Sequence, residues 1–128
     1  MRLLLDTHAL LWALNDDGRL SRAAREAIDD RSNEVLVSAA SAMEIATKHR
    51  IGKLPEAGPL ATDFEAVIRA ADYHALPVTV RHGVTAGKLD IPHKDPFDRL
   101  LIAQARVEGV PLVSNERLFD EFGVQRIW

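Results

Sequence analysis

The sequence predicts an α/β domain of three layers, with helices on both faces of a mostly parallel central sheet. Short apolar segments alternate along the chain with longer segments of helical periodicity, a pattern typical of strand–helix units in a parallel sheet. The 128 residues contain no repeat, low-complexity tract or linker. We therefore expect one domain over residues 1–128.

The first half of the chain is expected to contain two strands and three helices. We expect strands over 2–7 and 34–38, and helices over 7–16, 21–31 and 41–52. Leu10, Leu11 and Leu14 recur at helical spacing, whereas the β-branched residues of EVLVS favour a strand. Ser21 suits a helix N-cap and Gly52 suits a C-cap, so these residues mark two helix ends.

The second half continues the alternation after a loop punctuated by prolines and glycine. We expect helices over 60–74, 81–89, 96–108 and 115–122, and strands over 76–80, 109–114 and 124–128. Leu60, Phe64 and Ile68 share one amphipathic face, and Pro96 occupies a first helical position. Ligands of such sheets bind beyond the carboxyl ends of the strands, beside helix N-termini.

Composition limits the possible functions before any motif is considered. The chain has no cysteine, which excludes disulfides, thiolate metal sites and a cysteine nucleophile. A net charge of −3, from 16 basic and 19 acidic residues, gives no reason to expect tight nonspecific binding to nucleic acid. The longest apolar run, 9–14, is far shorter than the roughly 20 residues of a membrane span, and MRLLLD is too short for a signal-peptide core. We expect a cytoplasmic protein with no membrane partner.

Five acidic residues lie where predicted strands end or predicted helices begin. They are Asp6, Glu44, Asp95, Asp98 and Glu116. Taken singly, each has a structural explanation. Asp6 and Asp95 suit N-caps, Glu44 follows a serine at a capping-box spacing, and an acid in a first helical turn is stabilised by the helix dipole.

Asp98 lies on the same helical stripe as Leu101, Ile102 and Ala105, which suit a core. If the strands preceding the acids are neighbours in one sheet, their carboxylates converge. Two bare charges 4 Å apart repel by about 4 kcal/mol at an effective dielectric constant of 20. Mg²⁺ or Mn²⁺ would offset this repulsion, because these ions prefer oxygen ligands. The expected chemistry is attack of metal-activated water on a phosphodiester.

Four segments carry a family resemblance. They are LLLDTHALLW (3–12), SAMEIATKHRIGKL (41–54), DPFDRLLIAQA (95–105) and LVSNERLFDEFGVQRIW (112–128). Together they resemble the PIN-domain ribonucleases, particularly the VapC-type toxins of toxin–antitoxin modules. The resemblance implies a Mg²⁺- or Mn²⁺-dependent endoribonuclease that cuts RNA and leaves a 3′-hydroxyl and a 5′-phosphate. It also implies a cognate antitoxin that occludes the site, and a homodimer.

The resemblance assigns roles to individual acids. Asp6, Glu44 and Asp98 match the metal-binding acids of the family. The fourth family acid is usually an aspartate in a Thr-x-Asp pattern, and the matching stretch here, 114–116, reads Ser-Asn-Glu. The longer side chain of Glu116 leaves open whether it binds metal directly, through water, or not at all.

Other residues are expected to support these acids. Thr7 and Ser114 are placed to hydrogen-bond the carboxylates, with Asn115 adjacent, and Asp95 is expected to support the site as a helix cap. Four cationic side chains are candidates for RNA phosphate contacts, with a solvated surface as an equally good explanation. They are Arg99, Lys48, Arg50 and Lys53.

Three other functions are compatible with parts of the sequence. A metal-free ribonuclease would need a histidine pair, but no two histidines lie at a recognisable spacing, and His49 and His93 lie among cations. A phosphatase of the haloacid dehalogenase kind would need a second acid where the chain has His8. A receiver-like phosphoacceptor domain would need two acids after the first strand and a late lysine at a strand end, and neither is found.

Overall fold

The computed structural model describes residues 1–128 and is built around a five-stranded sheet in which every neighbouring pair of strands is parallel. The strand order is β3-β2-β1-β4-β5. The strands are β1 (Arg2–Leu5), β2 (Glu34–Ser38), β3 (His74–Leu76), β4 (Leu112–Val113) and β5 (Arg126–Ile127). The predicted α/β class is confirmed, and the sheet is wholly rather than mostly parallel.

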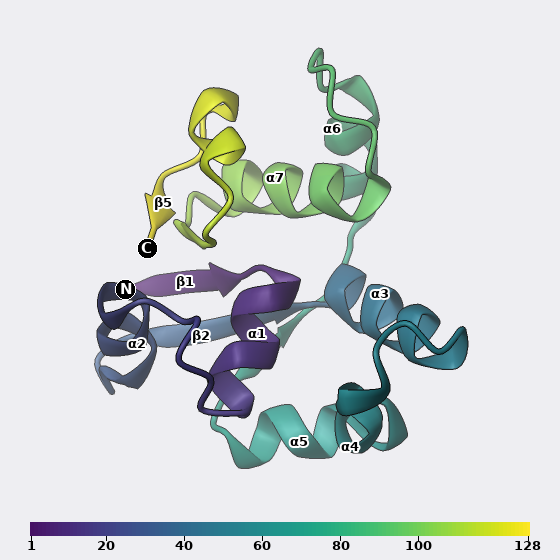
Figure 1. Cartoon of the computed structure of the whole chain (residues 1–128). Coiled ribbons are helices and arrows are strands. Elements are labelled where there is room, and N and C mark those ends of the chain that lie inside the picture. The colour runs from purple at the N-terminus through teal and green to yellow at the C-terminus, as the bar shows by residue number, and fades with distance from the viewer.

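Helices cover both faces of the sheet (Figure 1). They are α1 (Thr7–Leu14), α2 (Arg22–Asp29), α3 (Ala39–Arg50), α4 (Gly58–Thr62), α5 (Phe64–Ala70), α6 (Val80–Lys88) and α7 (Pro96–Glu108), with 3₁₀ helices η1 (Pro55–Ala57) and η2 (Arg117–Phe122). One hydrophobic cluster joins the sheet to α1, α2 and α5, and a second joins its other face to α7 and η2. The predicted three layers are therefore present.

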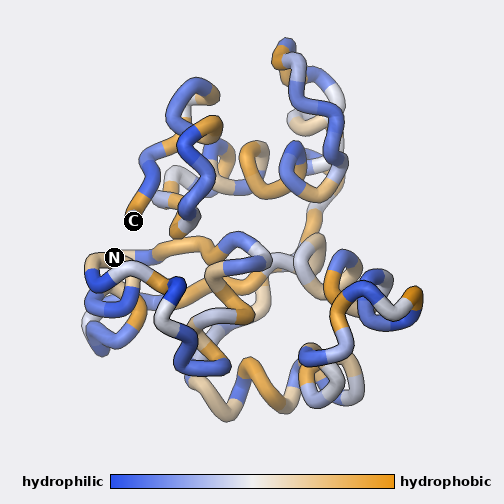
Figure 2. Tube along the Cα trace, viewed as in Figure 1, coloured by the Kyte–Doolittle hydropathy of each residue, from blue (hydrophilic) through white to orange (hydrophobic).

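Alternating side chains of β1 supply both clusters. Leu3 and Leu5 pack in the first cluster and Leu4 packs in the second, and all three are fully buried. A strand covered on both faces reads as a continuous apolar run, as β1 does. Burying one such leucine contributes about 1.5 to 3 kcal/mol. Figure 2 shows hydrophobic residues concentrated in these central strands.

β1 lies between β2 and β4, although these strands come from distant parts of the sequence. The chain moves outward from β1 to β2 and β3, and later returns to the opposite side of β1 at β4 and β5. A reversal of strand order of this kind leaves a crevice beyond the carboxyl ends of the strands, where α/β proteins bind ligands. We therefore expect the functional site among the residues that follow β1, β2 and β4.

Helix α3 begins two residues earlier than predicted. Ser38, the last residue of β2, is its N-cap and accepts a hydrogen bond from Ala40 N at 2.9 Å. The predicted capping box from Ser41 to Glu44 is therefore wrong, because both residues lie inside the helix. The expected glycine follows the helix end, since Gly52 has a φ of +79°, which favours glycine.

The predicted helix over 60–74 is two helices with a break at Asp63. This residue has an extended φ of −148° and caps α5 by accepting a hydrogen bond from Ala66 N. The predicted strand over 76–80 is also displaced, to His74–Leu76. Pro77 has no N–H for the sheet, and Thr79 caps α6 instead.

The C-terminal strands are shorter than predicted, and the segment between them is a 3₁₀ helix. Phe119 and Phe122 are both buried against α7 and lie three residues apart. Residues at this spacing share one side of a 3₁₀ helix, which has three residues per turn. The aromatic anchors therefore favour the tighter helix.

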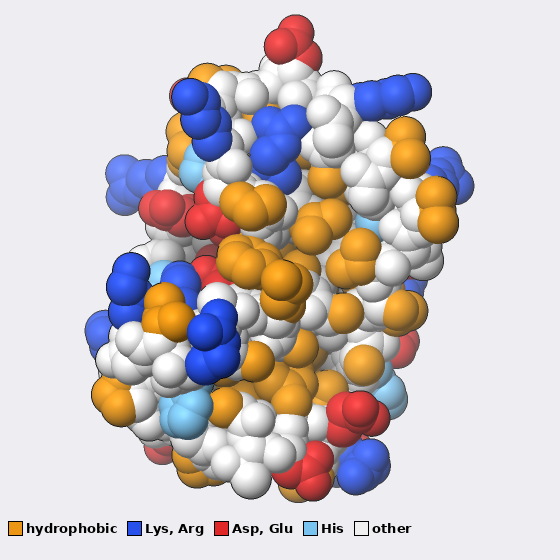
Figure 3. All heavy atoms as spheres, turned by 90° about the vertical axis from the view of Figure 1, so that its right-hand side faces the viewer, with side chains coloured by type: hydrophobic (Ala, Val, Ile, Leu, Met, Phe, Trp, Pro, Cys, Tyr) orange, Lys and Arg blue, Asp and Glu red, His pale blue; other side chains and the backbone are white.

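One face of the molecule, formed where α3 and α6 lie, presents apolar side chains to solvent (Figure 3). The exposed large hydrophobic residues of these two helices are Met43 on α3 and Val80 and Val84 on α6. We call this surface the α3–α6 face. None of the helices has the length and apolar character needed to cross a membrane.

Candidate active site

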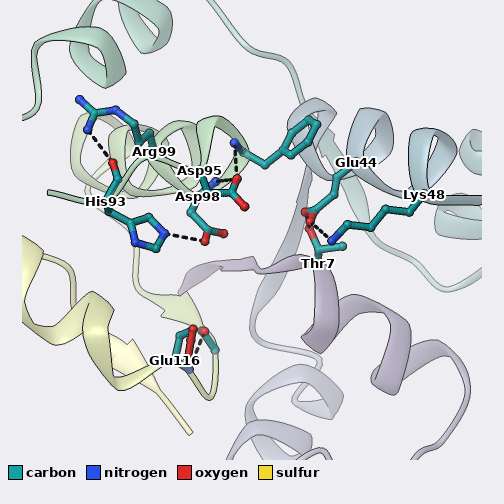
Figure 4. A network of polar contacts seen from close by, with 10 residues as sticks. Thr7, Glu44, Lys48, His93, Asp95, Asp98, Arg99 and Glu116 are labelled. Atoms are coloured by element: carbon teal, nitrogen blue, oxygen red, sulfur yellow. Dashed lines mark hydrogen bonds and ion pairs between the residues drawn. The ribbon is translucent and has the colours of Figure 1, made fainter. Parts of the chain in front are cut away.

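Five carboxylates line one small hollow at the carboxyl ends of the central strands: the helix cap Asp95 and four acids from four separate segments. Asp6 follows β1, Glu44 lies in the helix after β2, Asp98 lies in the first turn of α7, and Glu116 follows β4. The hollow has a volume of about 130 Å³ and all four residues line it. Figure 4 shows Glu44, Asp98 and Glu116 approaching it from different elements. The strand order brings these acids together, as the sequence led us to expect.

Asp6 is buried at the base of the hollow, with 6% of its surface exposed. Its Oδ1 caps α1 by accepting a hydrogen bond from Ala9 N at 2.7 Å. Burial raises the pKa of the Asp6 carboxyl to about 6, although hydrogen bonds from Ser114 and Ala9 and the charge of His8 act in the opposite direction. The capping role and the position in the hollow are therefore both present.

Glu44 is equally buried, with 6% exposed, and both of its oxygens have partners. Oε1 accepts a hydrogen bond from Thr7 Oγ1 at 2.6 Å, as predicted for Thr7. Oε2 pairs with Lys48 Nζ at 2.6 Å, one helical turn further along α3. Thr7 Oγ1 also lies 3.1 Å from Ser41 Oγ and accepts from that hydroxyl, because the single Thr7 proton goes to Glu44. The first residue of α1 is therefore joined to α3 by side-chain contacts.

Asp98 is half-buried and points into the hollow from α7 (Figure 4). Burial raises the pKa of its carboxyl, and the nearby charges of Asp95 and Glu44 raise it further, whereas a hydrogen bond from His93 lowers it. The separation between His93 Nε2 and Asp98 Oδ2 is 2.8 Å. The charge of Asp98 also raises the pKa of Asp6, and both carboxylates line the same hollow as Glu44.

The remaining acids are more exposed. Asp95 caps α7, and its Oδ1 accepts hydrogen bonds from Phe97 N at 2.9 Å and Asp98 N at 3.2 Å, as predicted. Glu116 is exposed, and its backbone N–H donates to Ser114 Oγ at 3.0 Å. Asn115 is also exposed. Glu116 is therefore oriented through its main chain, with a free carboxylate.

Comparison with known proteins places this chain in a family. A family model described as PIN domain matches residues 3–125. The chain belongs to the PIN domain family. This PIN domain is 31% identical over 117 residues to Ribonuclease VapC22 of Mycobacterium tuberculosis, and the matched region covers 89% of this chain and 86% of that protein. The resemblance recognised in the sequence is confirmed.

Solved structures share the fold of this PIN domain. The VapBC2 structure from Rickettsia felis, bound to a DNA fragment from its promoter, matches with a TM-score of 0.72 and 15% identity over 100% of both chains. The Mycobacterium tuberculosis toxin VapC20, described as cleaving the sarcin-ricin loop, matches with a TM-score of 0.66 and 17% identity over 95% of both chains. These low identities support the fold alone.

The four basic residues predicted to contact RNA differ in whether their side chains already have partners in the structure. Arg99, a predicted phosphate contact, instead donates to the carbonyls of Ala86, Leu89, Ile91 and His93. These bonds occupy all five N–H groups of its guanidinium, so no donor remains for RNA.

Lys48 lines the hollow but is paired with Glu44. Arg50 and Lys53 are exposed at the end of α3. These two side chains are the ones in the predicted basic cluster that are fully available to a phosphate, and their role remains a prediction.

The carboxylates of the hollow suit a hard divalent cation by their chemistry. As placed, no three His, Asp or Glu side chains lie close enough together to hold one ion unaided. Mg²⁺ keeps several waters and is commonly held by one or two carboxylates together with substrate phosphate oxygens, so it needs no such cage. Glu44 uses both carboxylate oxygens for Thr7 and Lys48, whereas Asp98 uses only Oδ2 for His93 and keeps Oδ1 for the hollow. The donor set therefore fits such an ion.

Two residues of the site were missed by sequence reasoning. His8 lines the hollow and stacks on Trp12 with ring centroids 5.6 Å apart, a pair at helical i,i+4 spacing that the pattern of α1 could have indicated. His93 was placed among cations, but its ring lies against Asp98. It lies in an irregular loop, where spacing carries no information about which way a side chain points.

Proposed function

We propose that this PIN domain is a divalent-metal-dependent endoribonuclease and the toxin of a toxin–antitoxin pair. The observation that carries the proposal is the meeting of Asp6, Glu44, Asp98 and Glu116 at one hollow beyond three adjacent parallel strands. The 31% identity to Ribonuclease VapC22 supports a nuclease over the phosphatase and phosphoacceptor alternatives. Mg²⁺ or Mn²⁺ is the proposed ion.

The side chains of the hollow have different proposed roles in phosphodiester hydrolysis. When bound, a divalent ion lowers the pKa of a water molecule and neutralises charge that develops on the phosphodiester. Asp6, Glu44 and Asp98 would hold the ion, with Glu116 as a fourth and less constrained oxygen donor. Thr7 orients Glu44, and the Lys48 ammonium at 2.6 Å from Glu44 brings positive charge to the hollow, where a phosphate would lie.

The proposed substrate is RNA, and the proposed products carry a 3′-hydroxyl and a 5′-phosphate. A net charge of −3 requires the phosphate backbone to be bound locally. We assign Arg50 and Lys53 to this contact because they are exposed beyond the end of α3, the helix that carries Glu44.

The chemistry is tested with purified protein and end-labelled RNA. We expect cleavage in Mg²⁺ or Mn²⁺ and complete inhibition by EDTA. The products should be linear, with 5′-phosphates that a ligase can join to a 3′-hydroxyl. Cleavage in EDTA that yields a 2′,3′-cyclic phosphate would contradict the metal-dependent mechanism and support histidine acid–base chemistry instead.

We also propose two protein partners. The first is an antitoxin that occludes the hollow, supported by structural neighbours solved as VapBC assemblies from Rickettsia felis and Haemophilus influenzae. A neighbouring small protein should copurify with the chain and inhibit it.

The second partner is another copy of the chain, which we place on the α3–α6 face because contiguous exposed apolar surface marks interaction sites. Light scattering should show a dimer that Val84→Glu converts to a monomer. A monomeric wild-type protein would contradict this assignment.

A further inference from the structure

We propose that His93 is a positioning residue that orients the Asp98 carboxylate toward the divalent ion, and that Arg99 holds His93 in place for this purpose. The inference rests on the proposed function, because it assumes that Asp98 binds the ion. It gives His93 a role, and it replaces the RNA contact that the sequence suggested for Arg99.

The contact between His93 and Asp98 is short and partly buried. Nε2 of His93 lies 2.8 Å from Oδ2 of Asp98, and the two side chains are 20% and 27% exposed. An ionised carboxylate can only accept, so Nε2 carries the proton and donates it. The bond holds Oδ2 and leaves Oδ1 free, so it selects which carboxylate oxygen is presented to the hollow (Figure 4).

Aromatic packing sets the orientation of the His93 ring. The ring meets Phe119 edge-on, with centroids 6.4 Å apart and planes at 77°, and lies 6.2 Å from the ring of Phe122. Both phenylalanines are buried on η2. His93 is thus pressed between η2 and α7, and its Nε2 is directed at Asp98.

Arg99 fixes the main chain of the loop that carries His93. Arg99 is the residue after Asp98 on α7, and its guanidinium donates to the His93 carbonyl at 2.9 Å. It also donates to the Leu89 carbonyl at 2.7 Å and to the Ala86 carbonyl at 2.7 and 3.1 Å, with a longer contact to Ile91 at 3.4 Å. The loop between α6 and α7 has no regular secondary structure, so this one side chain supplies bonds that a strand or helix would otherwise provide.

These contacts form a continuous path from Arg99 through the loop to His93 and then to Asp98. Partners that hydrogen-bond the ligands of a metal typically change metal affinity by about 10- to 100-fold when they are removed. Anchoring of the loop alone would require Arg99 but would not require an imidazole aimed at the carboxylate. The His93 bond is therefore the element that connects loop structure to ion binding.

The test measures Mn²⁺ binding directly, by electron paramagnetic resonance of the free ion, in the full chain without RNA. We expect His93→Ala to weaken Mn²⁺ binding about 10-fold. His93→Gln, whose amide N–H can reach the same carboxylate, should recover most of the affinity, whereas His93→Leu should not. His74→Ala, an exposed histidine at the opposite end of the sheet, is the matched control and should bind as the wild type does.

Arg99 is tested by a double-mutant cycle. Arg99→Lys keeps the charge but cannot bond the same carbonyls, so it should weaken Mn²⁺ binding as His93→Ala does. The double variant should be no weaker than either single variant, because both act through one path. Fully additive losses would show that Arg99 does not act through His93 and would overturn its part of the proposal. If Arg99→Lys fails to fold, the His93 series still decides the proposal.

The outcomes separate this inference from the proposed function. If Asp98→Asn abolishes Mn²⁺ binding but His93→Ala binds as the wild type does, the positioning role is wrong and the metal site stands. Equal affinities of the Gln and Leu variants would also overturn the positioning role, because packing alone would then explain the effect. If Asp98→Asn binds Mn²⁺ normally, the proposed function itself fails.

Discussion

At the amino ends of β2 and β3 the molecule has a hollow of about 540 Å³, whereas the hollow at the carboxyl ends of the central strands is only about 130 Å³. Both contain several acids. In the larger hollow Asp29, Asp30 and Asp72 are exposed, and the pKa of Asp30 is lowered by hydrogen bonds from the Ser32 side chain and backbone. In the smaller hollow burial raises the pKa of Asp6 to about 6.

The difference lies in the cost of keeping the acids charged. The acids of the larger hollow are solvated, and Asp30 closes a local turn with Ser32, so they need no external ligand. Asp6 and Asp98 lose hydration without gaining an equivalent partner, which disfavours their charged forms. A bound cation would offset that cost. The smaller hollow is therefore the better candidate site, although the larger one has four times the volume.

The sharpest test of the difference between the two hollows substitutes one acid in each of them by asparagine. Asp98→Asn keeps the shape of the side chain and removes its charge, so we expect RNA cleavage to fall by more than about 100-fold and Mn²⁺ affinity to fall with it. Asp72→Asn is the control in the larger hollow, because asparagine tolerates the φ of +65° found there. Equal activity of both variants would remove the distinction between the hollows.

The second test uses pH and the metal-free protein. The folded chain retains the Asp6 proton up to about pH 6, whereas the unfolded chain releases it near the ordinary pKa of 3.8. The folded state therefore binds more protons between these values, and the free energy of unfolding should fall as pH rises through them, by on the order of 2 to 3 kcal/mol. The loss is complete once the pH is well above the folded-state pKa of about 6.

Urea denaturation in EDTA at a series of pH values measures this dependence. Asp6→Asn should flatten the curve and should be more stable than the wild type at pH 7, since asparagine also caps helices. Asp30→Asn is a useful contrast, because the lowered pKa of Asp30 contributes stability that is present at higher pH and lost on acidification. A wild-type curve that rises between pH 4 and 6 would contradict the assignment to Asp6.

Substitutions of Asp95 distinguish a structural role from a metal-binding role within the segment DPFDRLLIAQA (95–105). Asp95→Ala removes the bonds to the first turn of α7 and should lower the free energy of unfolding by about 1 kcal/mol, whereas Asp95→Asn should lose only a few tenths. RNA cleavage by Asp95→Asn should remain near the wild-type rate. A loss as large as that of Asp98→Asn would instead make Asp95 a member of the metal site.

Substitution of Glu116 should change the rate of RNA cleavage far less than substitution of Asp98. The Glu116 carboxylate is exposed, and its position is set by the main-chain bond to Ser114. An interaction of this carboxylate with the ion through water therefore contributes little binding free energy. We expect Glu116→Gln to reduce cleavage by about fivefold or less. Glu116→Asp, which introduces the residue that the resemblance to the family implies at this position, should match or exceed the wild-type rate at saturating Mg²⁺. A hundredfold loss in the Gln variant would place Glu116 among the direct ligands.

Several elements were predictable because their signals are local. Helix α7 begins at Pro96 after the Asp95 cap, and the apolar run of β1 marks a strand covered on both faces. The errors occurred where neighbouring structure overrides local preference. Ser38 both ends β2 and caps α3, and Asp63 divides what the periodicity alone predicts as one helix.

The sequence by itself determined the α/β class and the identity of Asp6, Glu44 and Asp98 as candidate ligands, because alternation, caps and motif spacing are properties of short segments. Tertiary structure decided that these acids share a hollow with Glu116, that Lys48 pairs with Glu44, and that Arg99 holds a loop rather than facing solvent. Strand order and the direction of loop side chains depend on packing between residues far apart in the chain. The contact of His93 with Asp98 belongs to this second group, since the loop acquires its shape only against η2 and α7.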